Sequence, residues 1–131
     1  MQNIFNFLAN PSRFRLFSHK YYSYTLFIMF TFISLGLWYG LVNSPPDYQQ
    51  GETVRIMYVH VPAAWMAMMI YLSMTIMSIF ALVWRHPLAD ILSKCSAPIG
   101  ASFTLIALVT GSIWGKPTWG IWWAWDARLT S

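Results

Sequence analysis

Charged side chains are scarce in this chain of 131 residues. Only 9% of its residues are charged, whereas a soluble domain carries roughly 25%. Hydrophobic residues make up 57% and aromatic residues 18%, and the apolar residues form long blocks rather than stripes. This composition excludes an ordinary soluble domain and predicts an integral membrane protein.

Cysteine is nearly absent as well. The single cysteine, Cys95, excludes an internal disulfide, and the lack of a C-x-x-C-H motif excludes covalent attachment of haem to this chain. The formal charge of +4 comes from scattered Lys and Arg residues that form no basic face for phosphates, which argues against a nucleic-acid partner.

The residue arrangements of common catalytic sites are also missing. No Ser/His/Asp set, no paired carboxylates and no cluster of cysteine ligands suggest hydrolytic chemistry. Residues 111–118 have one residue too few between their glycines for a phosphate loop, and a proline follows the lysine, so no ATPase is expected.

Three uncharged stretches are long enough to cross a hydrocarbon core of roughly 30 Å as helices. They predict an all-α, polytopic membrane protein with transmembrane helices at 21–42, 56–84 and 95–114. Because proline fits a helix best in its first turn, Pro62 and Pro98 are expected near the starts of the second and third helices. His60 would then lie at the mouth of the second helix.

Four connecting segments complete the chain. Residues 1–20 mix aromatic and basic side chains and are expected to lie on an anionic membrane surface on the inner, cytoplasmic side. The paired prolines after Asn43 predict an outer loop over 43–55, and the charges and proline of 85–94 predict an inner loop. Residues 115–131 form a tryptophan-rich segment on the outer face.

Basic residues predict the orientation. Five of the eight lie in the segments before the first span and between the second and third, against three in the outer loop and the tryptophan-rich segment, so the N-terminus is expected inside. Three crossings then place His60 on the same side as the tryptophan-rich segment, and His19 and His86 on the other side.

Five of the eight tryptophans crowd into the last part of the chain, at Trp114, Trp119, Trp122, Trp123 and Trp125. Gly115, Pro117 and Gly120 predict an irregular start, with Thr118 as the N-cap of a helix beyond it. Such a helix would gather Trp119, Trp122, Trp123 and Asp126 in one sector. The cluster fits a binding surface for a large flat ligand, or an anchor at the membrane interface.

Two polar residues near this cluster allow more than one role. His60 could hydrogen-bond to a loop carbonyl, or its neutral imidazole could be an axial ligand of haem iron. Asp126 could orient a ligand, cap a helix, or pair with Arg128 or Lys116. Gly100, Ala101, Ala107 and Gly111 would permit close helix packing, although we expect no face with a clean small-xxx-small run.

The tryptophan-rich segment resembles a known signature. Trp-Gly-Lys-Pro-Thr-Trp-Gly-Ile-Trp-Trp-Ala-Trp-Asp-Ala-Arg-Leu-Thr (114–130) resembles the WWD motif of the haem-handling membrane proteins of cytochrome c biogenesis. Trp-Asp-Ala-Arg-Leu-Thr is similar to the cytochrome c maturation protein C (CcmC) branch, whereas haem-lyase relatives tend to read Trp-Asp-Pro-Lys-Glu. Residues 47–64 and 97–112 agree, so the resemblance covers about 45–131.

The resemblance implies a non-enzymatic role in haem export or delivery. It implies that His60 is an axial ligand of non-covalent haem b, and that the tryptophans 114, 119, 122, 123 and 125, with Asp126, form the shelf on which haem lies. The implied partners are a periplasmic haem chaperone, ABC transporter subunits with a separate ATPase, a small single-span membrane protein and membrane lipid. The implied location is the bacterial, or alternatively the mitochondrial, inner membrane.

The chain also departs from that family pattern. Members have about six spans and a second outer-face histidine, whereas three spans are expected here, as in an N-terminal half. Two rival hypotheses are a structural or assembly subunit, with the tryptophans docking a partner helix, and a haem-lyase component. The absence of Pro-Lys-Glu after Trp-Asp argues against the lyase.

Overall fold

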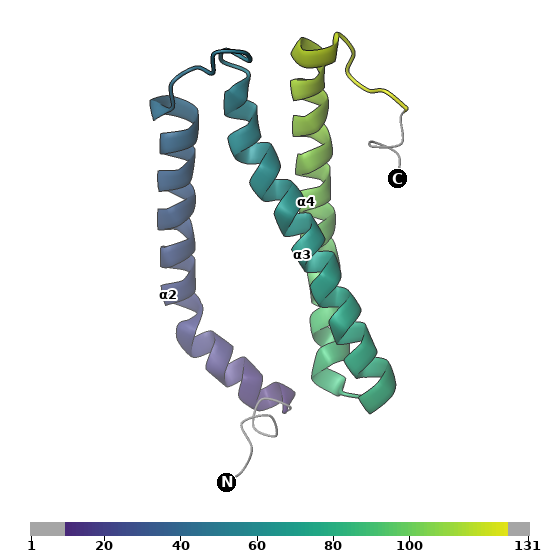
Figure 1. Cartoon of the computed structure of the whole chain (residues 1–131). Helices are drawn as coiled ribbons and strands as arrows, with labels where there is room; N and C mark the ends of the chain where they lie inside the picture. Colours follow the sequence, from purple (N-terminus) through teal and green to yellow (C-terminus); the bar gives the residue numbers. More distant parts are fainter. Residues whose placement is uncertain (1–9, 126–131) are drawn as a thin grey trace.

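Three long helices make up most of residues 10–125, the part of the chain that the computed structural model describes (Figure 1). Helix α2 (Pro11–Leu37) continues into a π-helical turn, η1 (Trp38–Asn43), and is followed by α3 (Val54–Trp84) and α4 (Pro87–Trp119). All three are long and apolar enough to cross a membrane, which confirms the predicted all-α fold with three spans.

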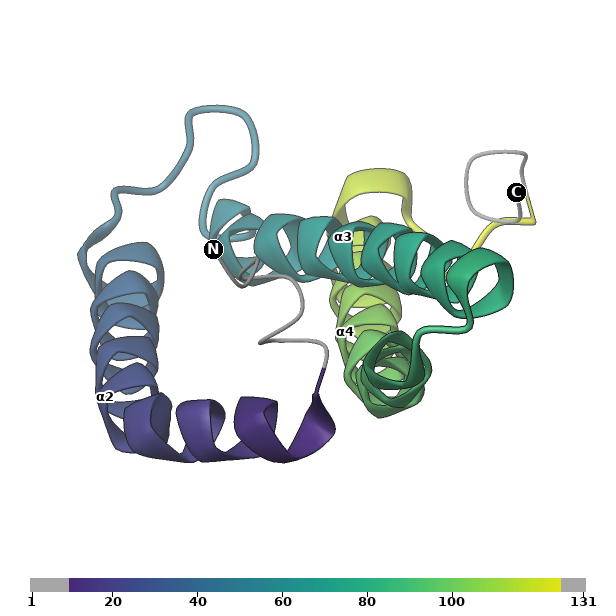
Figure 2. The same ribbon diagram turned by 90° about the horizontal axis from the view of Figure 1, so that it is seen from below.

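The helices are longer than a hydrocarbon core requires. Their 27, 31 and 33 residues correspond to about 40, 46 and 50 Å, against a core of roughly 30 Å. Part of each helix therefore projects beyond the core or is taken up by tilt. The first turns of α2 bend away from the rest of that helix (Figure 2). The exact limits of the membrane-embedded parts stay predictions.

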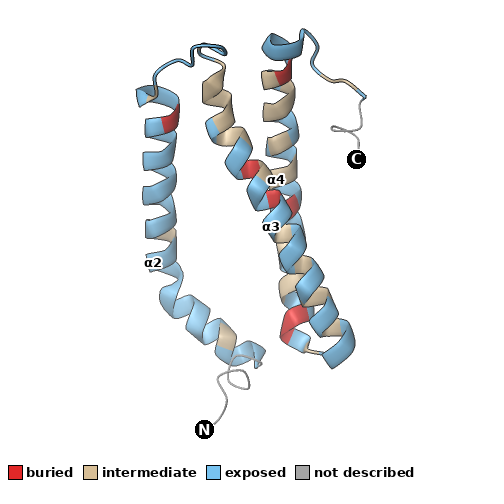
Figure 3. Cartoon of the chain, in the orientation of Figure 1, coloured by how far each residue is buried: buried red, intermediate tan, exposed pale blue. Residues whose placement is uncertain are grey.

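Small residues let α3 and α4 cross closely. Ala63 and Ala67 of α3 and Gly100 of α4 are buried at the crossing, and a Cβ on Gly100 would lie 3.0 Å from Cγ2 of Ile70. Most large apolar side chains are exposed instead, as Figure 3 shows by the pale blue of the helices. Close contact through small residues and an apolar outer surface are typical of helices that pack within lipid.

Helix α2 is attached to α3 near the loop that joins them. A Cβ on Gly40 would lie 2.9 Å from Cβ of Tyr58, so only glycine permits this approach. The guanidinium of Arg55 donates to the carbonyls of Leu41 (2.9 Å) and Ser44 (3.2 Å), which are left without helical partners where η1 ends.

The loop between η1 and α3 is a hydrogen-bonded turn. Oδ1 of Asp47 accepts from the backbone N–H groups of Gln49 and Gln50, at 2.8 and 2.9 Å. The hydrogen bond from Gln50 and, to a smaller extent, that from Gln49 lower the pKa of the Asp47 carboxyl. Gln50 also binds α4, because its Oε1 accepts from Nε1 of Trp114 at 3.0 Å.

The predicted inner loop over 85–94 is wrong. Arg85 turns the chain in the left-handed conformation (φ 50°), and α4 begins two residues later with Pro87 at its first position. His86 caps the new helix, because its Nδ1 accepts from the N–H of Ala89. Asp90 and Lys94 form an ion pair one helical turn apart, so the charges belong to a helix.

The predicted helix starts near Pro62 and Pro98 are also wrong. Helices α3 and α4 begin at Val54 and Pro87, and both later prolines lie inside a helix. Spanning helices tolerate interior proline because neighbouring helices and local adjustments satisfy the freed backbone groups. His60 accordingly lies in the second turn of α3.

The antiparallel arrangement puts two distant segments at one end of the molecule. The loop over 44–53 and the C-terminal end of α4 both lie at the top of Figure 1, and the turn between α3 and α4 lies at the bottom. We call the end that holds the loop over 44–53 and the C-terminal end of α4 the loop end. His60 is near it, as the three crossings predicted.

Candidate functional site

His60 joins α3 to α4 near the loop end. Its Nδ1 lies 3.0 Å from the carbonyl oxygen of Ala107 and 3.1 Å from Oγ1 of Thr110, both on α4. The carbonyl belongs to a helix and not to a loop, which corrects one of the two expected roles. The ring is half-buried, and within residues 10–125 only its Nδ1 makes hydrogen bonds, so Nε2 is available to a ligand.

Gly111 provides the space for this ring. A Cβ at position 111 would lie 3.0 Å from Cε1 of His60. That distance is shorter than ordinary van der Waals contact, so a larger residue would displace the imidazole. Helix α4 therefore presents a glycine where the ring rests and two oxygens where Nδ1 points.

The chain turns back after α4 and covers this region. The helix ends at Trp119, and Gly120 takes the left-handed conformation (φ 78°), with its N–H donating to the carbonyl of Lys116 at 2.9 Å. Ser112 then donates to the carbonyl of Trp122 at 2.8 Å, which holds the returning segment against α4.

This geometry overturns two predictions. The region of Gly115 and Pro117 is helical and Thr118 lies inside α4, so the expected irregular start and N-cap are wrong. Residues 120–125 are not helical, so no helical sector gathers the tryptophans. They come together because the chain reverses at Gly120.

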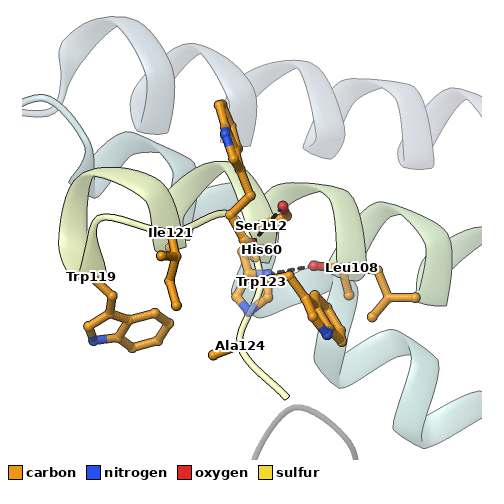
Figure 4. Close-up of a pocket in the computed structure, with 11 residues that line it drawn as sticks. His60, Leu108, Ser112, Trp119, Ile121, Trp123 and Ala124 are labelled. Atoms are coloured by element: carbon orange, nitrogen blue, oxygen red, sulfur yellow. Dashed lines mark hydrogen bonds between the residues drawn. The ribbon is translucent and has the colours of Figure 1, made fainter. Parts of the chain in front are cut away.

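A cavity of about 250 Å³ lies between the returning segment, α4 and His60 (Figure 4). Its lining combines the imidazole with three indoles and several small residues. The lining residues are His60, Ala107, Leu108, Gly111, Ser112, Gly115, Trp119, Ile121, Trp122, Trp123 and Ala124. The cavity is therefore mainly apolar and aromatic, with one imidazole.

The structure brings some of the predicted residues together and separates others. Trp119, Trp122 and Trp123 line the cavity with His60. Trp114 does not line it, and packs edge-on against Trp119 with 5.1 Å between ring centroids. Trp125 is 87% exposed and also lies outside the lining. Asp126 lies outside the described residues.

Two polar groups belong to residues that line the cavity or contact them. The indole N–H of Trp123 is buried and has no hydrogen-bond partner within residues 10–125, so it can donate to a ligand. Nζ of Lys116 lies 5.8 Å from the ring centroid of Trp122 and donates to the carbonyl of Gly120. Within the described part of the chain, no three His, Cys, Asp or Glu residues form a group that could hold a bare metal ion.

Sequence reasoning missed several residues of this site. Thr110, Ser112 and Ile121 were not singled out, and Ala107 and Gly111 were expected only to pack helices. A signal was present, because Ala107, Gly111 and Gly115 follow one another at intervals of four and share one helix face. All three line the cavity, so the prediction that no face carries a small-xxx-small run is wrong.

Comparison with known proteins agrees with these features. The family model of heme exporter protein C (CcmC) matches residues 4–131. Heme exporter protein C of Bradyrhizobium diazoefficiens is 51% identical over 124 residues, which are 95% of this chain and 47% of that protein. Heme exporter protein C of Escherichia coli K12 is 54% identical over 99 residues, 76% of this chain and 40% of that protein.

A plant relative extends the comparison. The putative cytochrome c biosynthesis ccmC-like mitochondrial protein of Marchantia polymorpha is 47% identical over 124 residues, which are 95% of this chain and 54% of that protein. The chain thus spans about half the length of the curated relatives it matches. With three membrane-length helices and bacterial heme exporter relatives, it is a multi-pass inner-membrane protein. Because the family model covers nearly all of it, the chain belongs to the heme exporter protein C family.

Proposed function

We propose that this chain binds haem at its loop end and takes part in haem export and delivery for cytochrome c biogenesis. One observation carries the proposal: the imidazole of His60 is seated among Trp119, Trp122 and Trp123 in one cavity. A neutral imidazole is a common axial ligand of haem iron, and indole faces can stack on a porphyrin. Haem is the cargo here and not a resident catalyst.

The residues present fit non-covalent haem b. Nδ1 of His60 is engaged with α4, which leaves Nε2 for iron. The buried, unpartnered N–H of Trp123 can donate to a polar group of the ligand. Cys95 is exposed and far along α4 from this end, and the chain lacks the motif for thioether attachment. We assign Trp114 and Trp125 to the rim of the same surface, and Asp126, which lies outside the described residues, stays a proposed haem contact.

The cavity accounts for only part of a haem site. Its volume of about 250 Å³ is below the range of about 300–1,000 Å³ that is usual for pockets of drug-sized ligands. The chain spans about half the length of its relatives. The second axial ligand and the opposite wall would come from the rest of such a protein.

The proposal also covers orientation and partners. The distribution of basic residues supports an N-terminus inside, with the cavity at the outer face. There the chain would hand haem to a periplasmic haem chaperone, in a complex with ABC transporter subunits and a small single-span membrane protein. The chain itself would carry out no bond-making step.

The test compares three histidine variants of the full-length protein. His60→Ala should abolish or strongly shift the Soret band of co-purified haem, because iron loses an axial ligand. His19→Ala and His86→Ala are matched controls that should keep the wild-type band, because both residues lie away from the cavity. An unchanged spectrum for His60→Ala would remove the ligand assignment.

A double variant separates haem binding from the rival role in assembly. If Trp122 and Trp123 only dock a partner helix, replacing both by leucine should leave haem absorbance unchanged. We expect the double variant to lose haem while the protein still enters its membrane complex. Haem-free wild-type protein would favour the assembly role.

A further inference from the structure

The surroundings of His60 determine which ring nitrogen carries the proton. Nδ1 lies 3.0 Å from the carbonyl oxygen of Ala107, which can only accept a hydrogen bond. A deprotonated Nδ1 would direct a lone pair at that oxygen and gain no bond. The proton of the neutral ring therefore lies on Nδ1, and the lone pair lies on Nε2.

Thr110 is arranged as a second acceptor for the same proton. Its hydroxyl donates to the carbonyl of Ile106 at 2.6 Å, the usual bond of a threonine to the preceding helical turn. A hydroxyl has a single proton, so at 3.1 Å from Nδ1 the Thr110 oxygen accepts from the ring.

We propose that α4 holds His60 as the Nδ1–H tautomer, with the lone pair of Nε2 offered to the cavity, and that Thr110 is the residue that positions and tunes this ligand. The inference deepens the proposed function and rests on it for the ligand role. A partner that accepts the second ring N–H of a metal-bound histidine fixes its orientation and raises its basicity. Thr110 thus acts on iron through His60, without touching haem.

His86 provides an internal contrast. Its Nδ1 accepts from the backbone N–H of Ala89 at 3.3 Å, where it caps α4. A ring nitrogen that accepts carries no proton, so neutral His86 has its proton on Nε2. One chain thus holds two histidines in opposite tautomers, which gives the measurement a built-in reference.

Nitrogen NMR on haem-free protein tests the tautomer directly. The full-length protein, labelled with ¹⁵N-histidine in lipid bilayers, is measured at about pH 8, above the ordinary histidine pKa of about 6.5. His60→Gln identifies the His60 signals by difference. We expect a proton on Nδ1 in His60 and on Nε2 in His86. A proton on Nε2 of His60 would overturn the inference.

Haem affinity tests the role of Thr110. Thr110→Val keeps the shape but removes the acceptor, and should weaken haem binding roughly tenfold, the lower end for such partners, because Ala107 still accepts. The midpoint potential of bound haem should rise, since a less basic imidazole stabilises ferric iron less. Thr110→Ser should restore both values, and unchanged His86 signals report an intact fold.

The outcomes separate the two proposals. Wild-type affinity and potential in Thr110→Val would overturn the role of Thr110, even if His60 binds haem. Failure of the wild-type protein to bind haem would remove the proposed function, while the NMR result would still decide the tautomer.

Discussion

Glycine at position 111 shows how one missing side chain sets up the site. In Gly111→Ala the new Cβ would lie 3.0 Å from Cε1 of His60, and the packed ring would have to move. Overpacking of this kind costs about 1–3 kcal/mol of stability. Because the imidazole is displaced from its position, we also expect the variant to retain less haem than the wild type. Haem retained per protein, measured from Soret absorbance, checks this.

Gly36→Ala is the matched control for that variant. Position 36 lies in α2 and a Cβ there would meet nothing within 4 Å, so only the helix propensity changes. Haem retention should stay at the wild-type value. If both variants retain haem equally, His60 does not depend on close contact with position 111.

Residue patterns predicted the conspicuous members of the site and missed the supporting ones. His60 and the tryptophans are chemically distinctive, so composition and the number of membrane crossings were enough to place them on the same side. Thr110 and Gly111 are ordinary residues of an apolar helix, and their importance depends on which face α4 turns towards α3. That rotation follows from packing, which a single sequence does not specify.

A single substitution tests whether the close contact between η1 and α3 stabilises the protein. In Gly40→Ala the new Cβ would lie 2.9 Å from Cβ of Tyr58. Real Cβ atoms essentially never come this close, so η1 and α3 must separate locally. We expect a loss of about 1–3 kcal/mol in stability, seen as a lower melting temperature in detergent than that of Gly36→Ala. Equal melting temperatures would show that this contact contributes nothing.

Helix existence was predictable and helix limits were not. Three uncharged runs in the sequence correspond to three helices, because lipid requires every backbone group to be paired. The predicted limits were wrong where a proline was interpreted as a helix start and where charged residues were interpreted as part of a loop. The sequence His86-Pro87 with Asp90 in the first turn is a helix start that could have been recognised.

The prediction for the tryptophan-rich segment was wrong for a different reason. Its spacing fits one face of a helix, but Gly120 ends α4 and turns the chain back. The indoles then meet through tertiary contacts, which include the bond from Ser112 to the carbonyl of Trp122. Trp119, Trp122 and Trp123 therefore lie together as predicted, but the cause is the chain reversal and not a shared helix face.

For the whole molecule, the orientation in the membrane is the first thing to test. In a Cys95→Ser background, Tyr48→Cys puts a thiol at a position that is 93% exposed in the loop over 44–53. Ser18→Cys puts one in the N-terminal part of α2 (Pro11–Leu37), and that part of the helix lies at the opposite end of the molecule (Figure 1). With the N-terminus inside, a membrane-impermeant maleimide should label only Tyr48→Cys in intact cells. The reverse pattern would contradict the orientation.

The role of His60 as the haem ligand of an aromatic cavity at the loop end is the central claim about this protein. The most direct measurement is chemical rescue in the full-length protein: His60→Gly opens space beside Gly111, and free imidazole is then added. We predict loss of the wild-type Soret band in His60→Gly and its return with imidazole, because the small ring can occupy the vacated position. A wild-type Soret band in His60→Gly without imidazole would contradict the role of His60 as the haem ligand.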